Sequence, residues 1–269
     1  MKKQLVLPDD LALSYVEYGS GKPVIFIPGW TYTVKVFARN LPVIAEHYRV
    51  LAYDPRSHGD STVMPHGNNY GQHGDDLHEF ISRLGVEECL LVGWSMGVST
   101  AYSYFEKYGT GRIRGFISID EPPKIRKENG SDWGEGEELE LQASLELITK
   151  HGHLKFFEEY LRHCYVSVPE EVFLHDMLRE AAKTPEHIAC ELIRNSFDLD
   201  YREVAGRIDK EIPVLQVVRK EWKQAAADWI RKNQPNARIY YMPAHLSFRE
   251  YAEDFNTQAL DFCNSCYRM

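Results

Sequence analysis

The sequence predicts an α/β protein, a doubly wound and mostly parallel sheet with a helical lid inserted between two of its strands. Short β-branched runs alternate with helical stretches along the chain, which is typical of a parallel sheet covered by helices. About ninety residues between the fourth and fifth buried runs contain no convincing strand. With 43% hydrophobic and 26% charged residues, the composition excludes a disordered chain and suffices for a packed core.

The strands are predicted from apolar runs in chain order. Leu11–Glu17 alternates and suits an antiparallel edge. The runs expected to be buried in the sheet are Val24–Ile27, Arg49–Tyr53, Cys89–Val92, Gly115–Ile119, Pro213–Val218 and Ala237–Met242. After the last run, apolar residues recur at spacings of three and four, which predicts one amphipathic helix with a stripe of Phe248, Tyr251, Phe255, Ala259 and Phe262.

The segment after Gly115–Ile119, which is the fourth buried run listed above and the sixth strand in the numbering of the fold, is expected to form the lid. It begins with a charged stretch over 124–140, which we interpret as a solvated loop. Four helical segments follow, Glu137–Thr149, Leu154–Tyr165, Pro169–Ala182 and Pro185–Ser196. An insertion entered at the carboxyl end of a parallel strand lies above the crevice where such sheets bind ligands. We therefore expect a core of residues 1–121 and 206–269 and a helical cap over residues 122–205.

Charge and cysteine content limit the kinds of partner and the cellular compartment that we expect. The formal net charge is −9, which disfavours a nucleic-acid or anionic-membrane surface. The N-terminal apolar run is too short for a signal peptide, and no stretch reaches the roughly 18 apolar residues of a membrane span. Five scattered cysteines favour reduced thiols in a cytoplasm. The expected partner is a small-molecule substrate, and whether the chain forms a homodimer is left open.

Gly93-Trp94-Ser95-Met96-Gly97 carries the strongest chemical signal. It directly follows Cys89–Val92 and opens a predicted helix, which is the strand–turn–helix context of a G-x-S-x-G nucleophile elbow. The serine must occupy a strained turn that raises its hydroxyl above the sheet, so the residues two positions either side must lack side chains. The helix N-terminus also directs the N–H of Met96 at the space beside Ser95.

A serine hydroxyl needs a base to accept its proton. Of the eleven histidines, His245 is the candidate because it follows the last predicted strand, whose carboxyl end lies at the same edge as Ser95. The loop after Val24–Ile27 would supply a second oxyanion donor, the N–H of Trp30. Trp94 is a further candidate for substrate binding. Trp94, Trp133 and Phe156 either line the pocket or pack the lid. No metal or organic cofactor is implied.

With these motifs the chain resembles the α/β-hydrolase superfamily over nearly its whole length. Asp54-Pro55-Arg56-Ser57-His58-Gly59-Asp60-Ser61 is similar to the family's D-x-R-G-x-G-x-S turn, in which Asp54 and Arg56 are implied to be structural. Ala244-His245 followed by Glu250 is similar to the G-H-x-x-x-x-E signature of the catalytic histidine. Ser57 and Ala244 replace the commoner glycines.

The third member of the catalytic triad departs from the family pattern. The family usually places an aspartate after the strand that corresponds to Pro213–Val218, in a G-x-x-D turn. Here Arg219 replaces the glycine and Trp222 stands where the aspartate is expected. Two candidates remain. Glu221 is one residue out of register, and Asp120 ends the strand Gly115–Ile119, a position from which some members supply the acid. We favour Asp120, with Glu221 as the alternative.

The sequence therefore predicts a cytoplasmic serine hydrolase of a small ester, lactone or thioester. An alternative comes from the cofactor-independent dioxygenases of hydroxyquinolone-type heteroaromatics, which share the fold and which the chain resembles in Pro-Gly-Trp and in an aspartate that ends the same strand. Their elbow is typically S-x-S-x-G, whereas this one resembles the hydrolytic form found in esterases and acyl-homoserine lactonases. A non-catalytic ligand receptor on the same fold is the third hypothesis.

Overall fold

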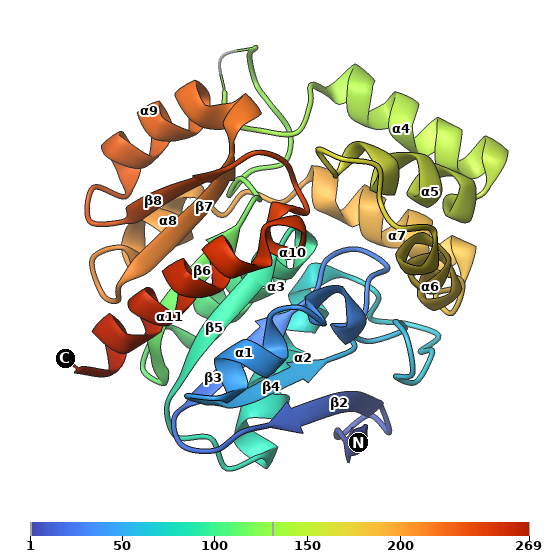
Figure 1. Cartoon of the computed structure of the whole chain (residues 1–269). Coiled ribbons are helices and arrows are strands. Elements are labelled where there is room, and N and C mark those ends of the chain that lie inside the picture. Colours follow the sequence, from blue (N-terminus) through green and yellow to red (C-terminus); the bar gives the residue numbers. More distant parts are fainter. Residues whose placement is uncertain (1, 131, 269) are drawn as a thin grey trace.

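The computed structural model describes residues 2–130 and 132–268, which form one eight-stranded sheet flanked by helices (Figure 1). The strand order is β1-β2-β4-β3-β5-β6-β7-β8. The pairs β1–β2 and β2–β4 are antiparallel, and the other neighbours are parallel, which confirms the predicted sheet. The strands are β1 (Lys3–Val6), β2 (Ala12–Tyr18), β3 (Pro23–Ile27), β4 (Arg49–Tyr53), β5 (Cys89–Trp94), β6 (Ile113–Ile119), β7 (Val214–Arg219) and β8 (Arg238–Met242).

Alternate residues of each central strand face opposite helical layers, as the two-residue period of a strand requires. In β3, Val24 and Phe26 belong to one apolar cluster, and Ile25 and Ile27 belong to the other. Helices α1 (Leu41–Ala45) and α11 (Ala252–Arg268) cover the first face; α2 (Tyr70–Arg83), α3 (Met96–Tyr108), α8 (Arg202–Ile208) and α9 (Lys223–Asn233) cover the second. No described helix combines the length and apolar character that a membrane span requires.

The edge strand β1 was not predicted. Its residues are largely exposed and pair only with β2 within the described chain. Because a strand covered on neither face needs no apolar alternation, the sequence carries no period-two signal there. All seven predicted strands are present, with ends that differ by one or two residues.

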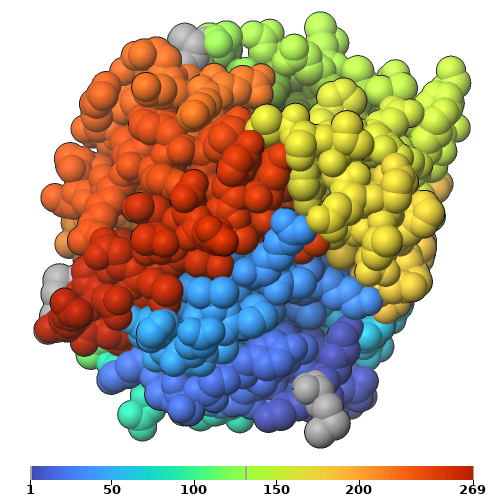
Figure 2. All heavy atoms as spheres, in the orientation of Figure 1, coloured from blue at the N-terminus to red at the C-terminus, as the bar shows by residue number. Residues whose placement is uncertain are grey.

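Four helices lie between β6 and α8, where the lid was expected: α4 (Glu138–His151), α5 (His153–His163), α6 (Glu171–Ala181) and α7 (Glu186–Phe197). In the space-filling view their yellow surface meets the red C-terminal segment and the blue N-terminal segment (Figure 2). The predicted boundary at 205/206 falls inside α8, which packs against α3 and α9. The division into core and cap stays a prediction, and Met1, Ser131 and Met269, which fall within the predicted segments, lie outside the described residues.

The prediction of a single C-terminal helix is wrong in one respect. The structure divides it into α10 (Ser247–Glu250) and α11, with Tyr251 between them and 38% exposed instead of on the apolar stripe. The side chain of Asn40 donates to the carbonyl of Phe248 at 2.8 Å. In a continuous helix that carbonyl would accept from Ala252 four residues on, so the asparagine replaces a helical hydrogen bond at the break.

The turn after β4 has the structural role that the resemblance implied. Asp54 is fully buried, and its carboxylate accepts the Val34 N–H at 2.9 Å. The guanidinium of Arg56, also buried, donates to both oxygens of Asp76 at 2.9 and 2.7 Å. These bonds tie the loop after β4 to the segment before α1 and to α2.

We expect a buried histidine in this turn to make the protein sensitive to acid. Burial lowers the pKa of His58 to about 4, whereas an unfolded histidine titrates near pH 6.5. Between these pH values the unfolded chain binds a proton at His58 that the folded chain does not. The contribution of neutral His58 to the free energy of unfolding is therefore fully present above about pH 6.5, and it falls by roughly 3 kcal/mol as the pH approaches 4.

Urea unfolding at about pH 7 and about pH 4.5 measures this loss. The variant His58→Asn keeps a donor for the Arg56 carbonyl, which lies 2.7 Å from His58 Nδ1, and does not titrate. Its loss of unfolding free energy between the two pH values should be about 2 kcal/mol smaller than that of the wild type. Equal losses in the two proteins would contradict the prediction.

Candidate active site

The candidate groups lie on loops that leave the carboxyl ends of neighbouring strands. β3 pairs with β4 on one side and with β5 on the other. The strands that follow β3 in the chain are therefore added first on one side of it and then on the other. A crevice at such a switch point is where α/β sheets bind ligands. The loop after β3 carries Trp30, the elbow after β5 carries Ser95, and the ends of β6 and β8 lead to Asp120 and His245.

The elbow at Ser95 has the strained geometry that its sequence predicts. Ser95 has φ 52° and ψ −133°, and it immediately precedes α3. Its N–H donates to the Ile119 carbonyl of β6 at 2.9 Å, which fixes the turn to the sheet. A Cβ at Gly97 would stand 2.2 Å from the Ile27 carbonyl oxygen, and one at Gly29 would stand 2.9 Å from Cβ of Ser95. The close approach of β3 to the elbow therefore requires glycine at both positions.

Two backbone donors flank the serine. The N–H of Met96 is the first of α3 and has no helical acceptor, and the N–H of Trp30 follows the turn at Gly29. Within the described residues, neither group takes part in a backbone hydrogen bond. Both residues line the same cavity as Ser95. Free N–H groups on either side of a nucleophile are the arrangement that stabilises an oxyanion.

His245 is held by four contacts in a buried position. Its Nδ1 lies 2.6 Å from Oδ2 of Asp120. Its carbonyl accepts from the indole N–H of Trp94 at 3.1 Å, and its ring contacts the rings of Trp94 and Tyr160, with centroids 5.0 and 5.9 Å away. Its Nε2 is buried and has no hydrogen-bond partner among the described residues. The bond to Asp120 leaves Nε2 free to act as a base.

The structure brings Asp120, and not Glu221, to the histidine. Asp120 is 3% exposed, whereas the Glu221 side chain is 80% exposed. The second oxygen of Asp120 accepts the backbone N–H of Arg219 at 2.8 Å, and the Arg219 guanidinium stacks over Trp222 at 3.4 Å from the ring centroid. The two residues that break the family's G-x-x-D turn therefore form a support for an acid on the neighbouring strand.

Arg219 places a buried positive charge beside this carboxylate. Its Nη1 lies 3.7 Å from Asp120, and its Nη2 lies 3.0 Å from Glu135. Burial by itself would lower the pKa of the guanidinium, but the carboxylates of Glu135 and Asp120 raise it above its ordinary value. From the sequence, Arg219 was interpreted only as a departure from a motif, and its role as a buried positive charge beside Asp120 was not predicted.

A cavity of about 260 Å³ opens above Ser95. Loops at the sheet edge line it together with residues of the predicted cap (122–205). The wall that the predicted cap forms, here called the cap wall, is mainly apolar, with Ile125, Leu141, Ile148, Phe156 and Ile193. The indole N–H of Trp30 donates to the Ala189 carbonyl of α7 at 2.9 Å, so the loop after β3 is tied directly to α7. A volume near the lower end of ligand pockets suits a small ligand.

Two of the three aromatic candidates lie elsewhere. Phe156 lines the cavity, but Trp94 is fully buried behind His245, against Tyr32 and Phe248. Trp94 donates to the carbonyl of His245 and so supports the histidine loop, and it does not line the cavity, where we expected it to contact substrate. Trp133 packs on Trp229 over β7 and β8.

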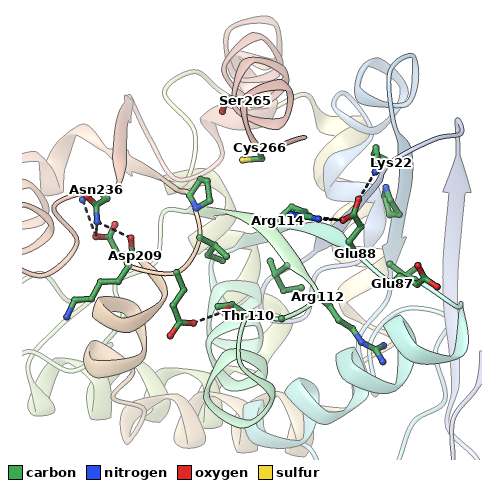
Figure 3. Close-up of a pocket in the computed structure, with 18 of the residues that line it drawn as sticks. Lys22, Glu87, Glu88, Thr110, Arg112, Arg114, Asp209, Asn236, Ser265 and Cys266 are labelled. Carbon is green, nitrogen blue, oxygen red and sulfur yellow. Dashed lines mark hydrogen bonds and ion pairs between the residues drawn. The ribbon is translucent and has the colours of Figure 1, made fainter. Parts of the chain in front are cut away.

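A larger hollow, of about 1110 Å³, lies at the opposite end of the sheet, where β3, β4, β6 and β8 begin (Figure 3). Several of its charged side chains are hydrogen-bonded to other residues of the hollow. Glu88 accepts from Lys22 at 2.5 Å and from Arg114 at 2.7 Å, and Glu211 accepts from Thr110 at 2.7 Å. This hollow contains none of the candidate catalytic groups. Among the described residues, no three histidine, cysteine or carboxylate side chains are grouped closely enough to hold a metal ion.

Comparison with known proteins agrees with the motifs and the topology. The family model for the alpha/beta hydrolase fold matches residues 22–143. A non-heme chloroperoxidase from Kitasatospora aureofaciens is 31% identical over 118 residues, which make up 44% of this chain and 43% of that protein. The chain thus matches less than half the length of this curated relative.

Two solved structures are similar over almost the whole chain. A bromoperoxidase from Bacillus anthracis has a TM-score of 0.89 at 22% identity and covers 98% of this chain and 100% of its own. An esterase from Exiguobacterium antarcticum has a TM-score of 0.88 at 20% identity, with 97% and 99% covered. By its elbow, its sheet order and these similarities, the chain has the alpha/beta hydrolase fold.

Proposed function

We propose that the protein is a serine hydrolase that cleaves a small ester, lactone or thioester through an acyl-enzyme intermediate. The observation that carries the proposal is the buried pair of His245 and Asp120, joined at 2.6 Å. This pair adjoins the elbow, since Trp94, which precedes Ser95, donates its indole N–H to the His245 carbonyl at 3.1 Å. The names of similar proteins support the same class, since they include an esterase and an enol-lactonase.

In this mechanism Ser95 Oγ attacks the carbonyl carbon of the substrate while Nε2 of His245 accepts its proton. The N–H groups of Trp30 and Met96 donate to the oxyanion of the tetrahedral intermediate. Asp120 accepts from Nδ1–H, which fixes the tautomer of the imidazole and stabilises the imidazolium. When the intermediate collapses, His245 returns the proton to the leaving alcohol or thiol, and water then releases the acyl group by the same steps.

A cofactor-independent dioxygenase is the alternative, because the acid ends β6, as in the dioxygenases of quinolones that the chain resembles. In that reaction the pair of His245 and Asp120 would remove a substrate proton, and the carbanion would react with oxygen without acylation of Ser95. The two functions differ in whether the serine is a nucleophile.

Labelling with a fluorophosphonate probe, located by peptide mass, tests this directly. We expect labelling at Ser95 in the wild type and its loss in His245→Ala, since the serine is unreactive without its base. Ser144→Ala is the matched control, because Ser144 lines the same cavity but donates to the Glu140 carbonyl at 3.0 Å. It should be labelled at Ser95 like the wild type. A folded wild type that is not labelled at Ser95 would contradict the proposal and favour oxygen-uptake assays with hydroxyquinolones.

A further inference from the structure

Glu121 is a buried carboxyl group in the cavity that the proposed mechanism does not use. It directly follows Asp120 at the end of β6, lines the cavity together with Ser95, and is 1% exposed. Sequence analysis did not single it out. The signal that was present is an acidic pair at the end of a buried strand, where one carboxylate suffices for a triad.

The carboxyl of Glu121 has no partner of its own. Within the described chain, neither oxygen has a hydrogen-bond partner. The Ser95 hydroxyl lies against it, close enough to lower its pKa slightly, but without a hydrogen bond of ordinary geometry. A buried polar group without a partner costs about 1–3 kcal/mol, so its presence at a cavity wall indicates that a ligand completes it.

The charged groups around Glu121 favour its protonated form. Burial, followed by the charge of Glu135, raises the pKa of Glu121 well above its ordinary value; the charge of Asp120 acts in the same direction, and Arg219 opposes them. Arg219 is already paired with Glu135 at 3.0 Å. The charge of Glu121 also raises the pKa of two buried phenols, Tyr70 and Tyr102, and the Tyr70 hydroxyl has no partner among the described residues. A protonated carboxyl has an O–H to donate.

The other carboxyl groups of the cavity are occupied. Glu135 accepts from Arg219, and Oε2 of Glu140 accepts the N–H of Glu137 at 2.9 Å in the first turn of α4. The cap wall opposite is mainly apolar. Among the described carboxyl groups of the cavity, Glu121 is therefore the one without a hydrogen-bond partner, and its position beside Ser95 places it near the carbonyl that the serine would attack.

We propose that Glu121 determines substrate specificity: its O–H donates to an oxygen two or three bonds from the scissile carbonyl carbon, so the enzyme prefers acyl groups with an ether, hydroxyl or keto oxygen there. This inference rests on the proposed hydrolysis at Ser95. Binding a hydrocarbon acyl group leaves the carboxyl unsatisfied, whereas an oxygen acceptor satisfies it, and sites of this kind discriminate against analogues that lack the polar atom.

Two nearly isosteric esters test the proposal, p-nitrophenyl methoxyacetate and p-nitrophenyl butyrate, which differ by one ether oxygen in place of a methylene. The ratio of their kcat/KM values is measured in wild type, Glu121→Leu, Glu121→Met and Glu121→Gln. Because the methoxy group also activates the ester, the change in this ratio between proteins, and not its value in one protein, reports the contact.

We expect the ratio to fall about tenfold in Glu121→Leu and Glu121→Met, which lack a donor. It should stay within about threefold of wild type in Glu121→Gln, whose amide N–H still donates. Two apolar variants are used so that a folding defect in one leaves the other to decide, and near-ultraviolet circular dichroism checks folding.

An unchanged ratio in a folded apolar variant would overturn the role of Glu121 and leave the hydrolase proposal intact. A ratio in Glu121→Gln as low as in Glu121→Leu would overturn the donor role in the same way. A folded wild type that hydrolyses neither ester would instead overturn the proposed function, and the inference about Glu121 with it.

Discussion

Ser95→Ala should lower kcat/KM for p-nitrophenyl butyrate by about 10⁴- to 10⁶-fold, because the members of a nucleophilic triad act as a unit. The remaining rate would come from the oxyanion donors at Trp30 and Met96 and from binding in the cavity. Alanine keeps the Cβ at this strained position, so the elbow should be preserved. Steady-state hydrolysis of the two p-nitrophenyl esters measures the effect.

Ser144→Ala, in the same cavity, serves as the control and should hydrolyse the esters within about twofold of wild type, as a change away from the reacting atoms does. If Ser95→Ala retained wild-type turnover, an acyl-enzyme at Ser95 would be excluded. A partial loss of turnover on a heteroaromatic substrate in Ser95→Ala, with a complete loss in His245→Ala, is instead the pattern of the dioxygenase alternative.

Asp120→Asn is expected to lower kcat/KM by about 10³- to 10⁴-fold. The amide can offer its N–H to Nδ1 of His245, which favours the tautomer with the proton on Nε2, and that tautomer cannot accept a proton from Ser95. The backbone N–H of Arg219 still has an amide oxygen to donate to, so the loop should keep its place. The same esters measure the effect.

Glu221→Gln is the matched change, a carboxylate replaced by its amide at the position nearest to the family's usual acid. Because the Glu221 side chain is 80% exposed and Asp120 already occupies Nδ1 of His245, its kcat/KM should change by less than about twofold, as for other exposed charges. A larger loss in Glu221→Gln than in Asp120→Asn would assign the acid to Glu221.

The parts of the fold that the sequence predicts are those in which burial is uniform. Central strands such as Cys89–Val92 are covered on both faces and read as continuous apolar runs. The elbow is predicted equally well, because the backbone at the end of β3 approaches Gly97 so closely that no side chain fits there. By contrast, the exposed strand β1 and the break at Tyr251 depend on a neighbouring edge and on the side chain of Asn40, and neither leaves a periodic pattern.

The sequence predicts a site residue well where a local motif contains it, and poorly where its role depends on a contact with a residue distant in sequence. Ser95 and His245 each follow a strand in a recognisable context. The sequence favours Asp120 over Glu221 only through the resemblance, because the contact that holds Asp120, the bond from the Arg219 backbone N–H, joins two strands that are distant in sequence. The burial of Trp94 and the solitary carboxyl of Glu121 likewise depend on which side of the sheet edge a side chain points to.

The position of the acid at the end of β6 also changes how the active site is distributed along the chain. Trp30, Ser95, Met96 and Asp120 all precede the cap helices, and His245 alone among the proposed catalytic groups is encoded after them. An exchange of helices α4 to α7 for those of another protein with this fold would therefore keep the proposed nucleophile, acid and oxyanion donors on one uninterrupted stretch. The loop that carries His245 is the one part of the proposed site encoded after the exchanged helices. Such a chimera would have to restore its contact with Trp94.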